Sequence, residues 1–183
     1  MAAYDIRMFG DPVLRQKAAE ITIVDGRLAK LAEDMAQTMY DAAGLGLAAP
    51  QVGVQQRLFV YDLQDDEGVK VLVNPVISEG RGEWLYEEGC LSVPGLHWEI
   101  VRPKEIHLTG YDLDGNEVSV EADELLARLF QHELDHLDGV LLIDHLDDER
   151  RKAAMRTLRE RLLAAPKPVA AAPAANRFGL KLP

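Results

Sequence analysis

One segment constrains this chain more than any other, namely Gln131-His132-Glu133-Leu134-Asp135-His136. An α-helix completes one turn in about 3.6 residues, so His132 and His136 project from the same helix face. The same spacing continues backward through Leu125 and Leu129, which makes this face apolar and directs both imidazoles toward the core. Buried imidazoles need partners, and a shared metal ion would satisfy both of them.

The only cysteine of the chain, Cys90, lies upstream within Glu88-Gly89-Cys90-Leu91-Ser92. One cysteine cannot form an internal disulfide, and a single thiol in a chain with a histidine pair is typical of a metal ligand or a nucleophile. Glu133 lies next to the histidine face, from where a carboxylate can reach a metal-bound water without binding the metal. These residues predict one metal site with a general base beside it. The alternative is a helix that happens to carry two histidines around a buried glutamate.

Length and composition predict an ordinary globular protein. The chain has 183 residues, of which 48% are hydrophobic and 28% charged. The first residues, Met1-Ala2-Ala3-Tyr4-Asp5, lack the basic and apolar regions of a secretory leader, and no apolar run is long enough to span a membrane. We therefore expect a cytoplasmic protein that binds no membrane, and a monomer is the simplest expectation for its oligomeric state.

The charges are distributed unevenly along the chain. The formal net charge is −11, but from Arg150 onward nine basic side chains stand against one acidic side chain, Glu160. This end therefore carries +8 and the remainder −19. A basic end on an acidic body favours docking to a polyanion, and the alternative is a solvated helix face.

Hydrophobic periodicity and turn residues predict helices at both ends and strands between them. The expected helices and the residues that end them are 26–42 with Gly44, 123–137 with Gly139, and 147–164 with Pro166. The expected strands are 57–61, 70–74, 106–111 and 117–120, the last two joined by a hairpin turn. The expected fold is α+β, with small antiparallel or mixed β-sheets packed around a central metal-binding helix and with N-terminal and C-terminal helices. Residues 1–165 are expected to form one domain, and the Ala- and Pro-rich residues 166–183 a flexible tail.

A glycine-rich segment, Gly44-Leu45-Gly46-Leu47-Ala48-Ala49-Pro50-Gln51, formally matches a dinucleotide-binding fingerprint. That fingerprint follows a strand and opens a helix, whereas this segment follows a predicted helix and places Pro50 where the phosphate-binding helix would continue. We therefore favour close approach of the backbone to a ligand, with Gln51 supplying an amide. The alternative is a glycine-rich turn with Gln51 pointing to solvent.

Three segments resemble, in order, the three signature motifs of the peptide deformylase family. They are the segments 44–51, 88–92 and 131–136 described above, and the resemblance extends from Asp11 to Asp144. Members of this family remove the formyl group from the N-terminal formylmethionine of newly made proteins, so the resemblance implies N-formylmethionyl nascent peptides as partners. It also implies docking to the ribosome surface through the basic C-terminal helix, with contacts from Arg150, Arg151, Lys152, Arg156 and Arg159.

The resemblance implies a role for each matched residue. The implied metal ligands are Cys90, His132 and His136. The family ion is Fe(II), one per chain, which zinc, nickel or cobalt can replace, and by ligand chemistry alone the same donors would suit zinc. Glu133 would be the general base on the metal-bound water. The Leu91 N–H and the Gln51 side-chain amide would stabilise the oxyanion, and Gly46 would shape the site.

The resemblance also implies an apolar pocket for the methionine side chain. Its residues in this chain are Leu45, Tyr86, Glu88, Leu125 and Leu129. The leucines are equally plausible as core residues. Several family members have arginine where this chain has His97, which is followed by Trp98, so the resemblance does not define contacts to the peptide beyond its first residue.

Two other kinds of protein fit part of this pattern. A zinc endopeptidase shares the HExxH helix, but its third ligand generally lies downstream, where only His145 is a candidate, and the cysteine motif would then have no role. A non-catalytic protein held together by a metal would usually have four protein ligands, whereas three ligands beside a glutamate favour catalysis.

Overall fold

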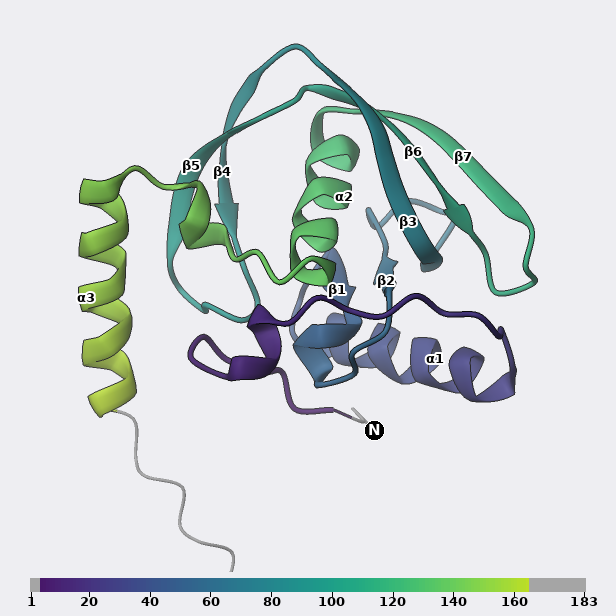
Figure 1. Cartoon of the computed structure of the whole chain (residues 1–183), viewed down its shortest axis with the longest axis horizontal. Helices are drawn as coiled ribbons and strands as arrows, with labels where there is room; N and C mark the ends of the chain where they lie inside the picture. Colours follow the sequence, from purple (N-terminus) through teal and green to yellow (C-terminus); the bar gives the residue numbers. More distant parts are fainter. Residues whose placement is uncertain (1–3, 165–183) are drawn as a thin grey trace, which may run out of the picture. The chain divides into compact units, whose positions relative to one another are not determined.

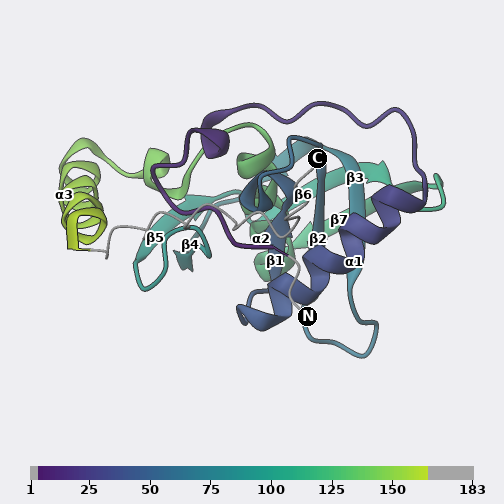
Figure 2. The same cartoon turned by 90° about the horizontal axis from the view of Figure 1, so that it is seen from below.

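The computed structural model describes residues 4–164, which belong to two compact units (Figures 1 and 2). The elements of the first unit, Met1–Asp147, are η1 (Pro12–Arg15), α1 (Gly26–Asp41), β1 (Gly46–Ala48), η2 (Ala49–Val52), β2 (Leu58–Tyr61), β3 (Lys70–Arg81), β4 (Trp84–Gly89), β5 (His97–Arg102), β6 (Glu105–Tyr111), β7 (Glu117–Asp123), α2 (Glu124–Leu137) and η3 (Leu142–His145). The second unit begins at Asp148 with α3 (Asp148–Ala164). The tail predicted for 166–183 lies outside the described residues. No helix within residues 4–164 combines the length and apolar character needed to cross a membrane.

The strands of the first unit form two antiparallel sheets. One sheet has five strands in the order β1-β2-β3-β6-β7, and the other pairs β4 with β5. Helix α2 stands between them, with β4 and β5 on one side and β3, β6 and β7 on the other, whereas α1 lies beside β1 and β2 (Figure 1). Antiparallel sheets around a histidine-bearing helix confirm the predicted α+β fold.

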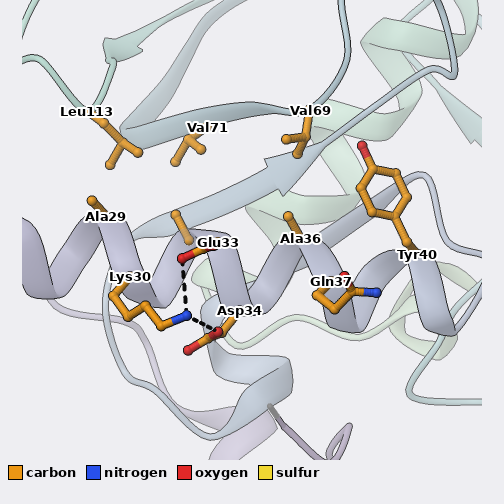
Figure 3. A pocket seen from close by; sticks show the side chains of 11 residues that line it. Ala29, Lys30, Glu33, Asp34, Ala36, Gln37, Tyr40, Val69, Val71 and Leu113 are labelled. Atoms are coloured by element: carbon orange, nitrogen blue, oxygen red, sulfur yellow. Dashed lines mark hydrogen bonds and ion pairs between the residues drawn. The ribbon is translucent and has the colours of Figure 1, made fainter. Parts of the chain in front are cut away.

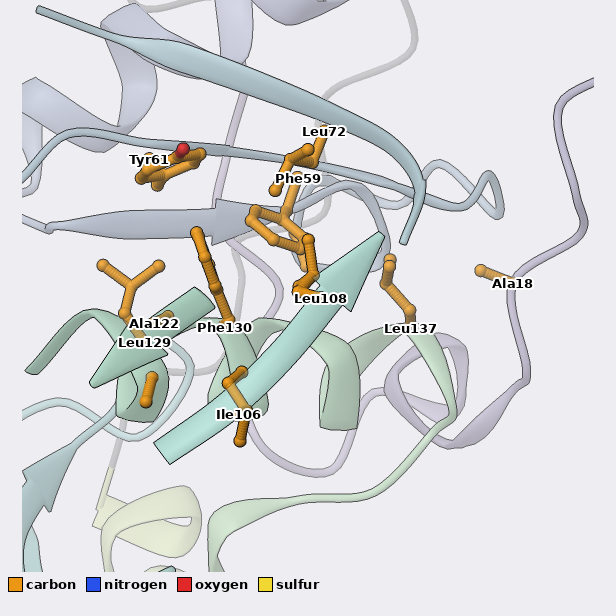
Figure 4. Close-up of a cluster of buried hydrophobic side chains, with 12 residues drawn as sticks. Ala18, Phe59, Tyr61, Leu72, Ile106, Leu108, Ala122, Leu129, Phe130 and Leu137 are labelled. Atoms are coloured by element: carbon orange, nitrogen blue, oxygen red, sulfur yellow. The ribbon is translucent and has the colours of Figure 1, made fainter. Parts of the chain in front are cut away.

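Helix α2 is held in this position by a core of aromatic and aliphatic side chains (Figure 4). The ring of Phe130, on the buried face of α2, packs edge to face against Tyr61 at 4.9 Å and lies 5.8 Å from Phe59. A second cluster, which includes Met35, joins α1 to β1 and β2. Strand β2 is therefore buried on both faces, which explains why its sequence is a continuous apolar run and not an alternating one.

Helix α1 ends differently from the sequence-based prediction. Its last residue is Asp41, and the left-handed position that follows is taken by Ala43, with φ of 54°, and not by Gly44. Glycine is needed at 44 for packing, because a Cβ there would lie 2.8 Å from Cδ1 of Leu91. The predicted end of α2 is confirmed, since Gly139 follows the helix with φ of 75°.

The strand prediction was incomplete. The run predicted for 70–74 is only the start of β3, which continues to Arg81 after a register shift that accommodates Pro75. Strands β1, β4 and β5 were not predicted. Among the described strands the last two pair only with each other. Charged Glu88 and Arg102 are buried in them while apolar Leu85 and Val101 are exposed, so their residue types do not alternate as in a regular half-buried strand.

Candidate metal centre and active site

Side chains from two parts of the chain meet to form a group of metal ligands. Cys90 directly follows β4, while His132 and His136 lie one turn apart on α2. Their ligand atoms all lie within 4.8 Å of one another. Cys90 Sγ is 3.2 Å from Nε2 of His136, and the two imidazole rings are 5.1 Å apart. Within residues 4–164 no other three His, Cys, Asp or Glu side chains form such a group.

The protonation of these side chains suits a metal site. Burial alone would raise the pKa of the Cys90 thiol, but the His136 and His132 rings lower it well below its ordinary value. The thiolate that results is the form of cysteine that binds metals. Burial alone would lower the pKa of His132, whereas Cys90 and Glu88 raise it well above its ordinary value. The thiolate thus favours positive charge between Cys90 and the two histidines. A divalent ion would supply that charge, so these side chains fit the metal ion that the sequence predicted.

Glu88 fixes the orientation of His132. Its buried carboxylate lies at the end of β4, with Oε2 3.0 Å from Nδ1 of His132. A ring nitrogen that bonds to a carboxylate leaves the other nitrogen free to face the metal position. Burial alone would raise the pKa of Glu88, but His132 and Arg102 lower it to about 2, so the carboxylate is charged at neutral pH. Glu88 thus borders the predicted pocket, but its charge is directed at His132 and not at a substrate.

Glu133 lies beside the ligand group and is buried. Its Oε2 has no hydrogen-bond partner among the described residues. Burial raises the pKa of Glu133 to about 7, although the His132 and His136 rings oppose this shift. Gly46 provides the space for this side chain, because a Cβ on residue 46 would lie 2.5 Å from Oε1 of Glu133. The carboxylate is therefore placed to exchange a proton with a molecule in the cleft.

The side chain of Gln51 is held in one orientation. Its Oε1 accepts a hydrogen bond from the Ala48 N–H at 2.8 Å, so its amide nitrogen faces the ligand group. That nitrogen donates to Ser92 Oγ at 3.3 Å and lies 3.8 Å from Cys90 Sγ. The interpretation of Gln51 as a solvent-exposed turn residue is therefore wrong, since only 1% of it is exposed.

A cleft of about 790 Å³ opens over these side chains. Its walls include Leu45, Tyr86, Glu88, Leu91, Leu125 and Leu129, as well as Gly46, Gln51, Cys90, His132 and Glu133. His97 also lines the cleft, whereas Trp98 is not among its lining residues, and the His97 ring covers Gly89, where a Cβ would lie 2.6 Å from the ring. The structure thus brings the predicted catalytic and pocket residues to one cavity.

Some residues around the site were missed in the sequence. Arg102 and Arg128 are buried and both donate to Oε1 of Glu88, and Ser92 binds Gln51. Arg128 stands one helical turn before His132 on the same face, so an arginine on an apolar stripe was the signal that could have identified it.

The remaining histidines have other partners. His145 Nε2 lies 2.7 Å from Asp135 Oδ2, and His107 lies between the hydroxyls of Ser78 and Ser119. Neither joins the ligand group, so the downstream ligand required for the endopeptidase interpretation is not provided by His145.

A second groove, of about 580 Å³, lies between α1 and the segment that carries Val69 and Val71 (Figure 3). Alanines form its floor, Val69, Val71 and Leu113 form one wall, and Lys30 binds Glu33 and Asp34 on the other. Its lining contains neither histidine nor cysteine, and it shares no residue with the cleft over the ligand group.

Three protein ligands on and beside an HExxH helix, with a buried glutamate next to them, define a metal-dependent hydrolase of α+β fold. The family model described as polypeptide deformylase matches residues 3–152. The chain belongs to the peptide deformylase family.

Known relatives support this assignment over most of their length. A peptide deformylase of Acidothermus cellulolyticus is 51% identical over 160 residues, which cover 87% of this chain and 88% of that protein. One of Parafrankia sp. is 48% identical over 161 residues, 87% of each chain. Among solved structures, a peptide deformylase from Legionella pneumophila superposes with a TM-score of 0.83 at 41% identity and covers 90% of this chain and 99% of that one.

Proposed function

We propose that this chain hydrolyses the formyl group from the N-terminal formylmethionine of newly synthesised proteins and releases formate. The observation that carries the proposal is the buried carboxylate of Glu133, whose Oε2 lacks a partner among the described residues, beside the group Cys90, His132 and His136. Membership in the peptide deformylase family supports the same reaction.

The proposed ion is Fe(II), one per chain, which zinc, nickel or cobalt can replace. A divalent ion held by Cys90, His132 and His136 would supply Lewis acidity, lowering the pKa of water and polarising a carbonyl oxygen. Thiolate and imidazole ligands suit several first-row metals, so the support for iron is the family resemblance. A thiolate in a ferrous site is open to oxidation, and activity should therefore fall in air.

Glu133 acts as the base and then as the acid in this proposal. Its carboxylate takes the proton from the attacking water and afterwards gives it to the departing amine. Burial raises the pKa of Glu133 in the metal-free protein to about 7, and a divalent ion beside it would lower this pKa and so favour the charged carboxylate that the base requires. Gly46 assists by leaving the space that this carboxylate occupies.

Gln51 and the backbone N–H of Leu91 stabilise the negative charge that grows on the formyl oxygen. Gln51 is suited to this role because Ala48 already occupies its Oε1, which leaves the amide nitrogen as the group directed at the cleft. Removal of one such donor typically costs about 2.7–4 kcal/mol of transition-state stabilisation.

The methionine side chain of the substrate enters the apolar part of the cleft, between Leu45, Tyr86, Leu125 and Leu129. The exposed fractions of Tyr86 and Leu125 are 47% and 41%, which is high for core residues and expected for the walls of an open pocket. Leu129, 7% exposed, would form its floor.

We further propose that the protein is a cytoplasmic monomer that docks on ribosomal RNA through α3. The side chains of Arg150, Lys152, Arg156 and Arg159 are exposed on this helix. Binding to phosphates by such side chains weakens steeply with salt, because counterions are released. A chain that lacks residues from Arg150 onward should bind ribosomes far more weakly while it keeps its activity on free peptides, and unchanged ribosome affinity would contradict the docking proposal.

The reaction itself is tested by anaerobic purification, metal analysis and formate release from formyl-Met peptides. Glu133→Ala should retain the metal and lose nearly all turnover, whereas Cys90→Ala should lose both. Glu87→Ala, an exposed carboxylate at the cleft, is the matched control and should keep near-normal rates. Cleavage of internal peptide bonds without formate release would favour an endopeptidase instead.

A further inference from the structure

Arg128 makes an unusual number of contacts for a side chain inside a core. It is 3% exposed and projects from α2 toward the two-stranded sheet. One guanidinium nitrogen, Nη1, donates to Glu88 Oε1 and to the Ile100 carbonyl, the latter at 3.1 Å. The other, Nη2, donates to the carbonyl of Trp84. A single planar group therefore ties α2 to both β4 and β5.

The same guanidinium lies over two aromatic rings of β4. Its Cζ is 4.9 Å from the centroid of the Trp84 ring and 5.7 Å from that of Tyr86. These two rings are themselves stacked, with centroids 4.7 Å apart and planes inclined by 26°. A cation over an aromatic face is attracted to it, most strongly where water is excluded. Tyr86 and Arg128 itself line the cleft, whereas Trp84 does not, so Arg128 supports the Tyr86 ring from within the surface that a substrate would touch.

Glu88 also binds a second arginine, Arg102. Arg102 donates to Oε1 at 2.6 Å and to Oε2 at 3.1 Å, and its remaining nitrogen binds Asp135 at 2.9 Å. With His132 on Oε2 and Arg128 on Oε1, the carboxylate has all four of its acceptor positions filled. Arg102 thus shares the task of holding Glu88 but does not stack on Trp84 or Tyr86 in the contacts described above.

We infer that Arg128 is a positioning residue that builds the metal site and the substrate pocket as one unit. It holds Glu88, and through Glu88 the ring of His132, and it also holds the Trp84–Tyr86 stack, of which the Tyr86 ring faces the cleft that receives the first side chain of the substrate. The role of Arg128 in the substrate pocket rests on the proposed function, whereas its role in the metal site rests on the ligand group alone.

Two substitutions separate these tasks. Arg128→Met keeps a long stem but has no donor, so it should release Glu88 and leave the Trp84–Tyr86 stack unsupported. Arg128→Lys keeps a charge that can bind Glu88, but an ammonium has neither the planar fork that serves several acceptors nor the flat face that lies on the rings. The lysine variant should therefore preserve the metal site and disturb the pocket.

The matched control is Arg57, which precedes β2 and binds the other end of the same helix. Arg57 is also buried and binds Asp138 at 2.7 Å and the carbonyls of Leu137 and Pro75 at 3.5 and 3.4 Å. Arg57→Met removes a comparable set of bonds from α2 without touching Glu88 or the Trp84–Tyr86 stack. It should lower the unfolding temperature and leave metal retention and substrate preference unchanged.

The experiment measures two quantities on zinc-loaded proteins at a temperature where all are folded. The first is the rate at which zinc passes to a chelator, which needs no activity, and the second is the ratio of kcat/KM for formyl-Met over formyl-Ala peptides. Arg128→Met should release zinc at least about tenfold faster, the usual minimum for loss of a group that orients a ligand, and its ratio should fall about tenfold. Arg128→Lys should release zinc within about threefold of the unsubstituted protein and show the same fall in the ratio.

Several outcomes would overturn the inference. Unchanged zinc release in Arg128→Met removes the role in the metal site, and an unchanged ratio in Arg128→Lys removes the role in the pocket. Equal effects in Arg57→Met would show a general loosening of α2. If the unsubstituted protein released no formate from either peptide, the proposed function would fail, and zinc release would still decide whether Arg128 holds the ligand group.

Discussion

The space left by Gly46 supports a quantitative prediction about the general base. A Cβ on residue 46 would lie 2.5 Å from Oε1 of Glu133, 2.9 Å from its Cδ and 3.1 Å from its Cγ, whereas ordinary van der Waals contact begins at 3.4 Å. In Gly46→Ala the carboxylate must therefore move by about 1 Å, because three of its atoms are too close to avoid the methyl group by a small rotation. A misplacement of this size in an active site can lower the rate about 100-fold.

This factor corresponds to about 2.7 kcal/mol in the activation free energy. We expect Gly46→Ala to lower kcat by about 100-fold with a much smaller change in KM, since the methyl group displaces the base and not the pocket walls. Metal content should remain normal, because the ligands Cys90, His132 and His136 lie on other elements. The assays are formate release from a formyl-Met peptide and metal analysis of the same preparation.

The matched control is Gly26→Ala in α1, where a Cβ would meet no atom within 4 Å. Its activity and metal content should equal those of the unsubstituted chain. Wild-type turnover in Gly46→Ala would refute the argument, because it would mean that the proton transfer tolerates a displaced Glu133. Loss of metal together with activity would also refute it, since the damage would then have spread to the ligand group.

Three further predictions concern the base, the oxyanion donor and the core. In the metal-free protein burial raises the pKa of Glu133 from 4.5 to about 7, so between these two values the folded chain holds a proton that the unfolded chain lacks. The stability that this proton contributes is fully present below pH 4.5 and is lost as the pH rises to about 7. Urea unfolding of metal-free Glu133→Gln at pH 5 and pH 8 should show that about 2.5 kcal/mol of this decline is missing, and an identical decline in both proteins would contradict the raised pKa. Gln51→Ala should lower kcat by about 100-fold or more at unchanged metal content, and an unchanged kcat would exclude Gln51 from the oxyanion site. Phe130→Ala should cost about 3–5 kcal/mol of unfolding free energy in urea titrations, and a loss under about 1 kcal/mol would mean that its contacts with Phe59 and Tyr61 do not anchor α2.

Features within one element could be predicted from the sequence. The spacing of His132 and His136 follows from helix geometry, as does the end of α2 at Gly139, and both agree with the structure. The hairpin of β6 and β7 was equally readable, because its turn and its two strands are contiguous. In each case the residues that decide the structure lie within a few positions of one another.

Strands β4 and β5 could not be predicted in this way. Helix α2, which lies far along the chain, contacts them through the charged side chain of Arg128. Glu88 is buried in β4 while Leu85 and Tyr86 are exposed, so the pattern of Trp84–Gly89 lacks a regular alternation. The role of Gly44 was misjudged for a similar reason, since the residue that requires a glycine there is Leu91 and not the helix before it.

The sequence by itself determined which side chains can bind a metal and move a proton, because helical spacing and residue chemistry are local properties, and it already offered Cys90 as a ligand or a nucleophile beside them. Only the tertiary structure decided how these groups are held. Glu88 meets Arg102 and Arg128 across 14 and 40 residues of chain, and the latter reaches the stack of Trp84 and Tyr86 at the same time. Such contacts depend on how the sheets pack around α2, and no spacing along the sequence specifies that packing.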